Sequence, residues 1–305
     1  MPKRSAISPE RRQELQLKNA CYVITCYKDE FLCKDHPNGR CERGFFSLFL
    51  QVVYGMAFAK KYDLPYKVDF TNVKYAYSGN QGSDQISFWE ALMVQSSPSP
   101  GYIPIVNLRY ETHPLRIWSR HFIRSLHQTL QSEIRLQDKL LNKANAIKER
   151  FKAFKILGLH ARRTDHPTEV PPVSDWVLIN KIEKRITAFD RLFVATDDTA
   201  FLETLRTRFP QKVLAHDFIR SETDRAIHDH GGRENGILLG EQALLDCLSL
   251  SFCQELILSP SNLSYAALVF QPETPYTLAE SSGAAWSRRK TLLAYRLNQW
   301  GIRKW

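Results

Sequence analysis

The sequence contains no segment that could cross a membrane as a helix. The uncharged and largely apolar run 44–59 is shorter than the roughly 20 apolar residues that a transmembrane helix needs. The first residues, Met-Pro-Lys-Arg followed by polar positions, contain no apolar core of a signal peptide. Internal repeats and low-complexity tracts are also missing. We therefore expect a cytoplasmic protein without a membrane span.

The sequence also lacks a recognisable metal-binding pattern. None of its six cysteines belongs to a Cys-X-X-Cys pair. The first four could form disulfides in an oxidising compartment, or hold a metal together with His36, but their spacing fits no zinc template. We interpret the cysteines as reduced thiols. The segment 228–230, His-Asp-His, has no third ligand at a suitable spacing, and we interpret it as a solvated loop. The cysteines are at positions 21, 26, 33, 41, 247 and 253.

Two motifs of nucleotide-binding proteins are absent. There is no Gly-X4-Gly-Lys-Ser/Thr, which argues against a P-loop phosphotransferase, and no Gly-X-Gly-X-X-Gly after a strand, which argues against a dinucleotide-binding fold. No Asp-X-Asp is present to hold a divalent cation on a sugar-nucleotide diphosphate. If a nucleotide diphosphate binds, arginine side chains must therefore supply the positive charge that a metal ion would otherwise provide.

The composition that remains is that of an ordinary globular protein. Of the 305 residues, 43% are hydrophobic and 24% charged, and the length favours two domains. The formal net charge of +10 favours anionic partners such as nucleotides, nucleic acid or acidic glycans. Basic residues are densest between Arg116 and Lys155, in a helical pattern that ends near Arg150. We interpret this stretch as a solvated helix face rather than a polyanion site.

Strand and helix patterns alternate along the chain, most clearly in its second half. Alternating strands and helices predict an α/β fold with a parallel sheet, in which ligands bind just past the carboxyl ends of the strands. Phe88, Trp89 and Trp118 could stack on sugar rings, but we interpret them as core residues. Strands are expected at 21–25, 67–70, 156–159, 192–195 and 256–258, an amphipathic helix at 44–59, and further helices at 200–208 and 237–252.

Polar residues follow each of the last three expected strands, in the segments 160–166, 196–198 and 259–264. Two adjacent arginines, Arg162 and Arg163, lie in the first of these segments. Guanidinium groups bind pyrophosphate through paired hydrogen bonds, and a helix that begins near Asn262 adds oriented N–H groups. The alternative is a structural network in which Arg163 pairs with Asp165 or Asp197. Because three strand ends converge, we favour a ligand site.

The sequence resembles the α-1,6-fucosyltransferases in three motifs. These are LGLHARRTD at 157–165, LFVATDD at 192–198 and the segment 234–262, and the resemblance extends over roughly 156–270. It implies a GT-B fold, in which two Rossmann-like domains enclose a nucleotide-sugar cleft. We expect an acceptor-side domain at 1–150, a GDP-sugar-binding domain at 151–280, and a helix within 281–305 that packs back on the N-terminal domain.

The resemblance also implies a function. The protein would transfer fucose from GDP-fucose to a hydroxyl group of a glycan acceptor, with inversion and without a metal ion or other cofactor, and it would bind no nucleic acid. Two alternatives remain open. The same fold could use another sugar nucleotide, or the chain could be a non-catalytic basic module that binds glycans or polyanions.

The resemblance assigns roles within the donor site. Arg162 would bind the β-phosphate and Arg163 would support the site, while His160 and Asp246 would contact the guanine. A carboxylate can accept from two guanine N–H groups at once. Without the resemblance, Asp246 is equally well interpreted as a buried cap or an ion-pair partner. The other donor-binding candidates are Asp165, Asp197, Asp198, Ser259, Ser261 and Asn262.

Inverting transfer requires a carboxylate that takes the proton of the attacking hydroxyl group. The fucosyltransferases resembled here carry Thr-Glu a few residues after the arginine segment, and this sequence has Thr168 and Glu169 one residue closer. Glu169 is therefore the candidate base, and Asp175 is the alternative. Together with Arg162, which faces the leaving group, these residues form the expected catalytic set.

Overall fold

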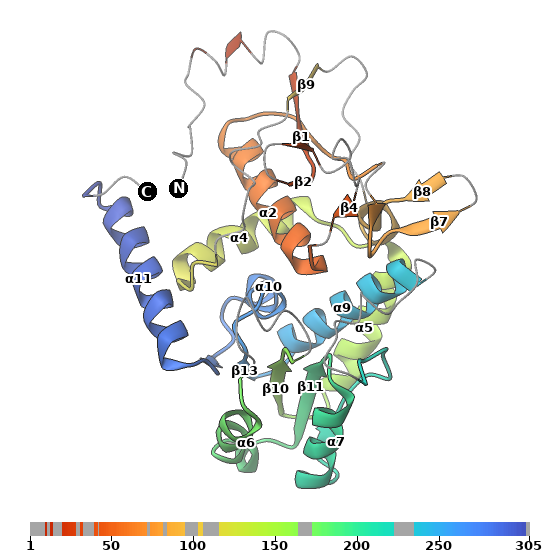
Figure 1. Ribbon diagram of the computed structural model, residues 1–305, viewed down its shortest axis with the longest axis vertical. Helices are drawn as coiled ribbons and strands as arrows, with labels where there is room; N and C mark the ends of the chain where they lie inside the picture. The colour runs from red at the N-terminus through yellow and green to blue at the C-terminus, as the bar shows by residue number, and fades with distance from the viewer. Residues whose placement is uncertain are drawn as a thin grey trace.

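The computed structural model describes residues 10, 13–14, 20–28, 31–32, 40–41, 43–71, 74–81, 84–94, 103–105, 116–163, 173–222 and 235–302. Two larger parallel sheets lie on either side of a layer of helices (Figure 1). The N-terminal sheet has the order β5-β1-β9, with β1 at Ala20–Ile24, β5 at Tyr66–Val68 and β9 at Ile103–Ile105. The C-terminal sheet has the order β12-β11-β10-β13-β14, formed by Val213–Leu214, Arg191–Thr196, Ile156–Ala161, Glu255–Leu258 and Tyr276–Leu278.

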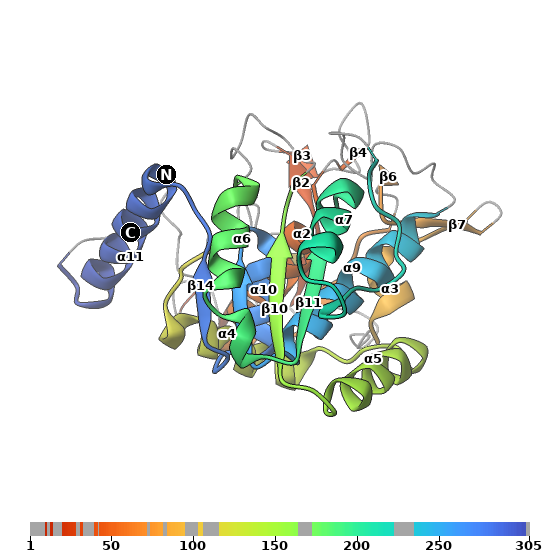
Figure 2. The same cartoon turned by 90° about the horizontal axis from the view of Figure 1, so that it is seen from below.

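The C-terminal sheet is covered on both faces, as its apolar strands require. Along β10, Leu157 and Leu159 face one core, while Ile156 faces another, because successive side chains of a strand point to opposite sides. The first core is closed by α6 (Asp175–Glu183) and α7 (Thr199–Arg208), which lie together on one face of the sheet in Figure 2. The second is closed by α9 (Gly236–Ser251) and α10 (Asn262–Phe270). The predicted α/β alternation is confirmed.

Helix α2 (Phe45–Lys61) differs from its predicted amphipathic character, because most of its circumference is buried. It contacts β1, α4 (Arg120–Glu133) and α10, so it has neighbours on several sides. Gln51, a polar residue that an amphipathic helix would expose to solvent, is only 1% exposed. Its amide donates to the carbonyl of Thr25 at 2.5 Å and accepts from Arg43 at 2.8 Å. These hydrogen bonds offset the cost of burying the polar side chain.

The prediction of a continuous helical pattern up to Arg150 is also wrong, because the chain forms two separate helices there. Helix α4 ends at Glu133, and α5 (Asp138–Phe151) begins after an extended segment. In that segment the Gln137 amide donates to the carbonyl groups of Glu90 and Met93 at 3.0 and 3.1 Å. The break therefore follows from contacts with α3 (Phe88–Leu92), more than 40 residues away in sequence.

The two halves of the chain share one apolar core. The rings of Phe49 on α2 and Phe270 on α10 stack with centroids 5.7 Å apart. The hydroxyl of Tyr265 on α10 donates to the carbonyl of Ile117 at 2.9 Å. At the start of α9, a Cβ on Gly236 would lie 2.6 Å from the carbonyl oxygen of Ala76 and would also meet that of Ser78. Helices α9 and α10 thus pack against the C-terminal sheet and also against helices of the N-terminal half.

Helix α11 (Ser282–Gln299) returns to the N-terminal half, where the centroid of the Tyr295 ring lies 5.4 Å from that of Phe122 on α4.

No helix among the described residues is long and apolar enough to span a bilayer. Phe88, Trp89 and Trp118 are buried, so sugar stacking by these rings is excluded. The described cysteines, 21, 26, 41, 247 and 253, are buried thiols. The remaining elements are β2 (Tyr27–Lys28), β3 (Phe31–Leu32), β4 (Arg40–Cys41), β6 (Lys74–Tyr75), β7 (Gly79–Gln81), β8 (Asp84–Ile86) and a 3-10 helix at Ile186–Ala188.

The close approach at Gly236 predicts an asymmetric response to alanine. Gly236→Ala should lower the free energy of unfolding by about 1–3 kcal/mol, because a methyl group there meets backbone oxygens that cannot rotate away. Gly283→Ala is the matched control, since Gly283 also lies at the start of a helix and has nothing within 4 Å of its Cβ position. The control should be neutral or slightly stabilising. Urea unfolding checks both, and equal effects would contradict this packing.

Candidate functional site

His160 lies at the carboxyl end of β10 with its ring buried against α10. Its Nδ1 atom is 2.7 Å from Oγ of Ser264, whose hydroxyl donates to the carbonyl of Ser259 at 2.6 Å. The single hydroxyl proton is therefore used, so Nδ1 carries the hydrogen of the imidazole and Nε2 is the acceptor. Burial, helped by the charge of Arg162, lowers the pKa of His160 to about 3. The ring is neutral near pH 7.

The N-terminus of α10 lies at the same edge of the sheet. Ser261 is its cap, accepting from the backbone N–H of Ser264 at 3.1 Å, and Asn262 is the first helical residue. The first turn contains no acidic side chain, so the positive end of the helix dipole is not neutralised from within the turn. Ser259 places a buried hydroxyl group here that has no hydrogen-bond partner among the described residues. This edge is suited to an anion.

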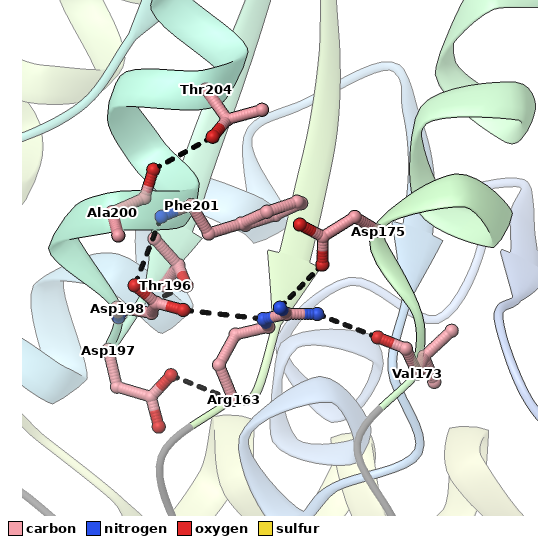
Figure 3. A network of polar contacts seen from close by, with 9 residues as sticks. All are labelled: Arg163, Val173, Asp175, Thr196, Asp197, Asp198, Ala200, Phe201 and Thr204. Carbon is pink, nitrogen blue, oxygen red and sulfur yellow. Dashed lines mark hydrogen bonds and ion pairs between the residues drawn. The ribbon is translucent and has the colours of Figure 1, made fainter. Parts of the chain in front are cut away.

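The guanidinium group of Arg163 binds three acceptors of the protein itself (Figure 3). Its Nη2 atom is 2.5 Å from the Asp175 carboxylate, Nη1 donates to the carbonyl of Val173 at 2.7 Å, and Nε lies 3.4 Å from Asp198. The ring of Phe201 packs 4.7 Å from the guanidinium carbon. The guanidinium of Arg163 is therefore directed toward loop segments and the start of α6.

The two aspartates after β11 complete this network. Asp197 accepts from the backbone N–H of Arg163 at 2.8 Å. Asp198 accepts from the backbone N–H of Phe201 at 3.0 Å and so caps α7, while its other oxygen faces Arg163. Arg163 therefore belongs to a structural network, but its guanidinium pairs with Asp175 and Asp198, whereas the predicted partner Asp197 bonds only its backbone N–H and Asp165 lies outside the described residues. Arg162 precedes Arg163, directly after the end of β10, and its charge contributes to the lowered pKa of His160.

The candidate bases differ in what the structure brings to them. Asp175 is the first residue of α6, and its carboxylate is paired with Arg163. Glu169 and Asp165 lie outside the described residues, as does the segment 228–230. Within the described part of the chain, no group of three or more His, Cys, Asp or Glu side chains could hold a metal ion.

Asp246 lies on α9 with a buried carboxylate oxygen, Oδ1, that has no hydrogen-bond partner among the described residues. Burial raises the pKa of Asp246 to about 7, and the charge of Arg220 opposes this rise. Arg220 donates to the carbonyl groups of His216 and Phe218 at 2.7 and 3.1 Å, while its Nε atom is buried without a partner in the described structure. A ligand with both donors and acceptors could satisfy this pair.

Sequence patterns did not reveal two of these residues. Arg220 belongs to an irregular segment, 215–220, that has no periodicity to mark it. Ser264 lies three residues after Ser261 in the expected segment 259–264. This spacing could have indicated that a second hydroxyl group lies beside His160. The structure brings His160, Ser261 and Ser264 together.

Comparison with known proteins finds the fold but no close relative. No family model matches the chain, and no curated protein matches it in sequence. A structure of NodZ alpha-1,6-fucosyltransferase co-crystallized with GDP is 17% identical, with a TM-score of 0.51, and the match covers 82% of this chain and 92% of that one. A second, soaked with GDP-fucose, is 16% identical, with a TM-score of 0.50 and coverage of 83% and 93%. A third, from Bradyrhizobium, is 16% identical, with a TM-score of 0.51 and coverage of 81% and 92%.

These matches confirm the expected GT-B, α/β fold class, and they place the fold of this chain with that of solved fucosyltransferases. The resemblance noted in the three sequence motifs therefore extends to the arrangement of the chain. At 16–17% identity the likeness concerns the fold. The site residues have to be argued from their own geometry.

Two substitutions at Asp198 distinguish the contribution of its capping hydrogen bond from that of its negative charge. Asp198→Ala removes the hydrogen bond to Phe201 and the contact with Arg163, and should lower the free energy of unfolding by about 1–2 kcal/mol. Asp198→Asn keeps a capping oxygen and loses only the charge, so its cost should be clearly smaller. Urea unfolding of both variants checks this. Equal losses would show instead that the contact with Arg163 dominates.

Proposed function

We propose that this protein transfers fucose from GDP-fucose to a hydroxyl group of a glycan acceptor, with inversion and without a metal ion. The observation that carries the proposal is the carboxyl edge of the C-terminal sheet. There Arg162 and the uncompensated N-terminus of α10 suit a diphosphate, in a fold shared with NodZ structures that were co-crystallized with GDP or soaked with GDP-fucose.

Guanine fits the unsatisfied groups of the site. Its N1–H and 2-amino groups can both donate to one carboxylate, which suits Asp246, whose buried oxygen lacks a partner in the described structure. The unused Nε of Arg220 can donate to a ring acceptor of the base. His160 presents Nε2 as a further acceptor, because Nδ1 is committed to Ser264. We assign the base to these side chains, with Ser259 and Asn262 nearer the diphosphate.

The chemistry follows from this placement. The acceptor oxygen attacks the anomeric carbon of fucose from the face opposite GDP, and the bond from that carbon to the β-phosphate oxygen breaks. The electron pair leaves with GDP, whose growing negative charge is stabilised by Arg162 and the dipole of α10. We assign the proton of the hydroxyl group to Glu169, because the alternative, Asp175, is already paired with Arg163.

We propose that the two substrates bind to different halves of the chain, each containing one of the two larger sheets. We assign the acceptor to residues 1–150 and the donor to 151–280, with 281–305 returning to the N-terminal half. The contact of Tyr295 with Phe122 supports the last assignment. Because the positive charge opposite the diphosphate comes from arginine and a helix dipole, the mechanism does not call for a divalent cation.

Binding in EDTA tests the choice of donor. GDP at a hundredfold excess over its Kd should stabilise the fold by about 2.7 kcal/mol in thermal-shift assays, and UDP- and CMP-sugars should not stabilise it.

Turnover in EDTA tests the role of Arg162. Arg162→Ala should lower transfer from GDP-fucose at least about a hundredfold while the protein stays folded, because the leaving group loses its counter-charge. Arg206→Ala, an exposed arginine on α7, is the control and should keep full activity. Strict dependence on Mg²⁺ or Mn²⁺, or binding of UDP-sugars, would overturn the assignment.

The raised pKa of Asp246 predicts that GDP binding depends on pH. The ligand-free carboxyl group is partly protonated below its pKa of about 7, whereas guanine requires the ionised form. GDP should therefore bind up to about tenfold more weakly for each pH unit below 7 and release up to one proton, while His160, with a pKa of about 3, stays neutral. Calorimetry in buffers of different ionisation enthalpy measures the proton release. Asp246→Asn should abolish it and weaken binding, and proton uptake by the wild-type protein would refute the role.

A further inference from the structure

Helix α11 lies on the flank of the molecule and packs on it through one side only. Figures 1 and 2 both show it at the edge of the structure, beside α4 and away from the layers of the two sheets. On the packed side, Tyr295 contacts Phe122, and the Arg288 guanidinium donates to Glu280 at 2.7 Å. This leaves a second, outward side of the helix.

That outward side carries large apolar side chains in one line. Trp286, Leu293 and Trp300 are spaced seven residues apart, about two helical turns, so they lie along one face. Tyr295 is nine residues from Trp286, about two and a half turns, and therefore points the opposite way, toward α4. The three side chains are 59%, 56% and 68% exposed, and Ile302 beyond them is 69% exposed. Such a contiguous set is unusual on a solvated surface.

Basic side chains flank this apolar line. The ammonium of Lys290 lies over the ring of Trp286, and Arg289 and Arg296 are on the same helix. The segment 282–299 contains no acidic residue. The nearby carboxylate of Glu280 is paired with Arg288, so it does not neutralise this face. The outward side of α11 therefore combines exposed tryptophan and leucine with positive charge.

We infer that α11 binds an anionic lipid surface, lying in the plane of the headgroups. Tryptophan and leucine side chains enter the boundary between headgroups and acyl chains, while lysine and arginine extend to the phosphates, which is the pattern of interfacial helices. A soluble polyanion would use the cations but would leave the apolar line exposed to water. The surface is separate from the donor site, so this inference does not rest on the proposed transferase activity.

Co-sedimentation of the full chain with vesicles tests the inference. The protein should bind vesicles of phosphatidylcholine and phosphatidylglycerol at 3:1, bind pure phosphatidylcholine far less, and be released as salt is raised toward about 0.5 M. Trp286→Ser with Leu293→Ser should reduce the bound fraction at least about tenfold, because the apolar area that enters the bilayer is lost. Arg289→Ser with Arg296→Ser should remove the preference for anionic vesicles.

The matched control pairs a tryptophan and a leucine that are exposed elsewhere. Trp176→Ser with Leu141→Ser changes side chains that are 72% and 41% exposed on α6 and α5, and it should bind vesicles like the wild type. Circular dichroism establishes that every variant is folded. Wild-type binding by the α11 apolar variant would overturn the inference. So would capture by dextran sulfate that depends on Arg289 and Arg296 but not on Trp286, which would assign this face to a soluble polyanion.

Discussion

The guanidinium group of Arg163 connects the segments that form the carboxyl edge of the C-terminal sheet. It reaches the aspartate that caps α7, the chain that enters α6 and a carboxylate at the start of that helix. Its side chain is only partly exposed, so its hydrogen bonds compete less with water than those of a surface arginine. A second link joins the segments after β10 and β11, because Asp197 accepts from the backbone N–H of Arg163. Arg162, its neighbour in the chain, directly follows β10 at this edge of the sheet.

The proposed donor site contains buried polar groups without hydrogen-bond partners, and their burial is unfavourable until a ligand binds. Asp246 has an oxygen without a partner, Arg220 has a nitrogen without one, and Ser259 has a hydroxyl without one, all within the described structure. An unsatisfied buried group costs roughly 1–3 kcal/mol, so a ligand that supplies the missing hydrogen bonds recovers this free energy on binding. The same burial, without a hydrogen-bond partner for Oδ1, raises the pKa of Asp246. In the proposed function, these unmet hydrogen bonds are what would make the site selective for a base.

Helices α9 and α10 link this site to the N-terminal half. Their inner sides cover the C-terminal sheet and their outer sides pack on α2, α3 and α4. Both helices also carry residues of the proposed donor site, Asp246 on α9 and Asn262 on α10. In that proposal, a change of packing between the halves would reach the donor site through these two helices. Glycine at 236 allows the close contact at one end of this layer.

The sequence alone determined the strands β10, β11 and β13 and the polar residues that follow them. Such strands are buried on both faces and are therefore apolar throughout, and this pattern can be recognised without knowing their neighbours. The motifs around these strands also indicated the fold. The fucosyltransferase fold of the solved structures agrees with them. What can be identified in this way is limited to features that one stretch of chain specifies by itself.

The tertiary structure decided the features that depend on two distant segments. The electrostatic influence of Arg220 on Asp246, the three acceptors of the Arg163 guanidinium and the burial of α2 on several sides are examples. Periodicity reports burial only where one face meets solvent, so the polar residues Ser47 and Gln51 indicated an exposed face, although the fold buries Gln51. Likewise, adjacent arginines have the same chemistry in sequence. Only folding shows that the guanidinium of Arg163 binds acceptors of the protein itself, and for this reason we propose Arg162 as the arginine that binds the ligand.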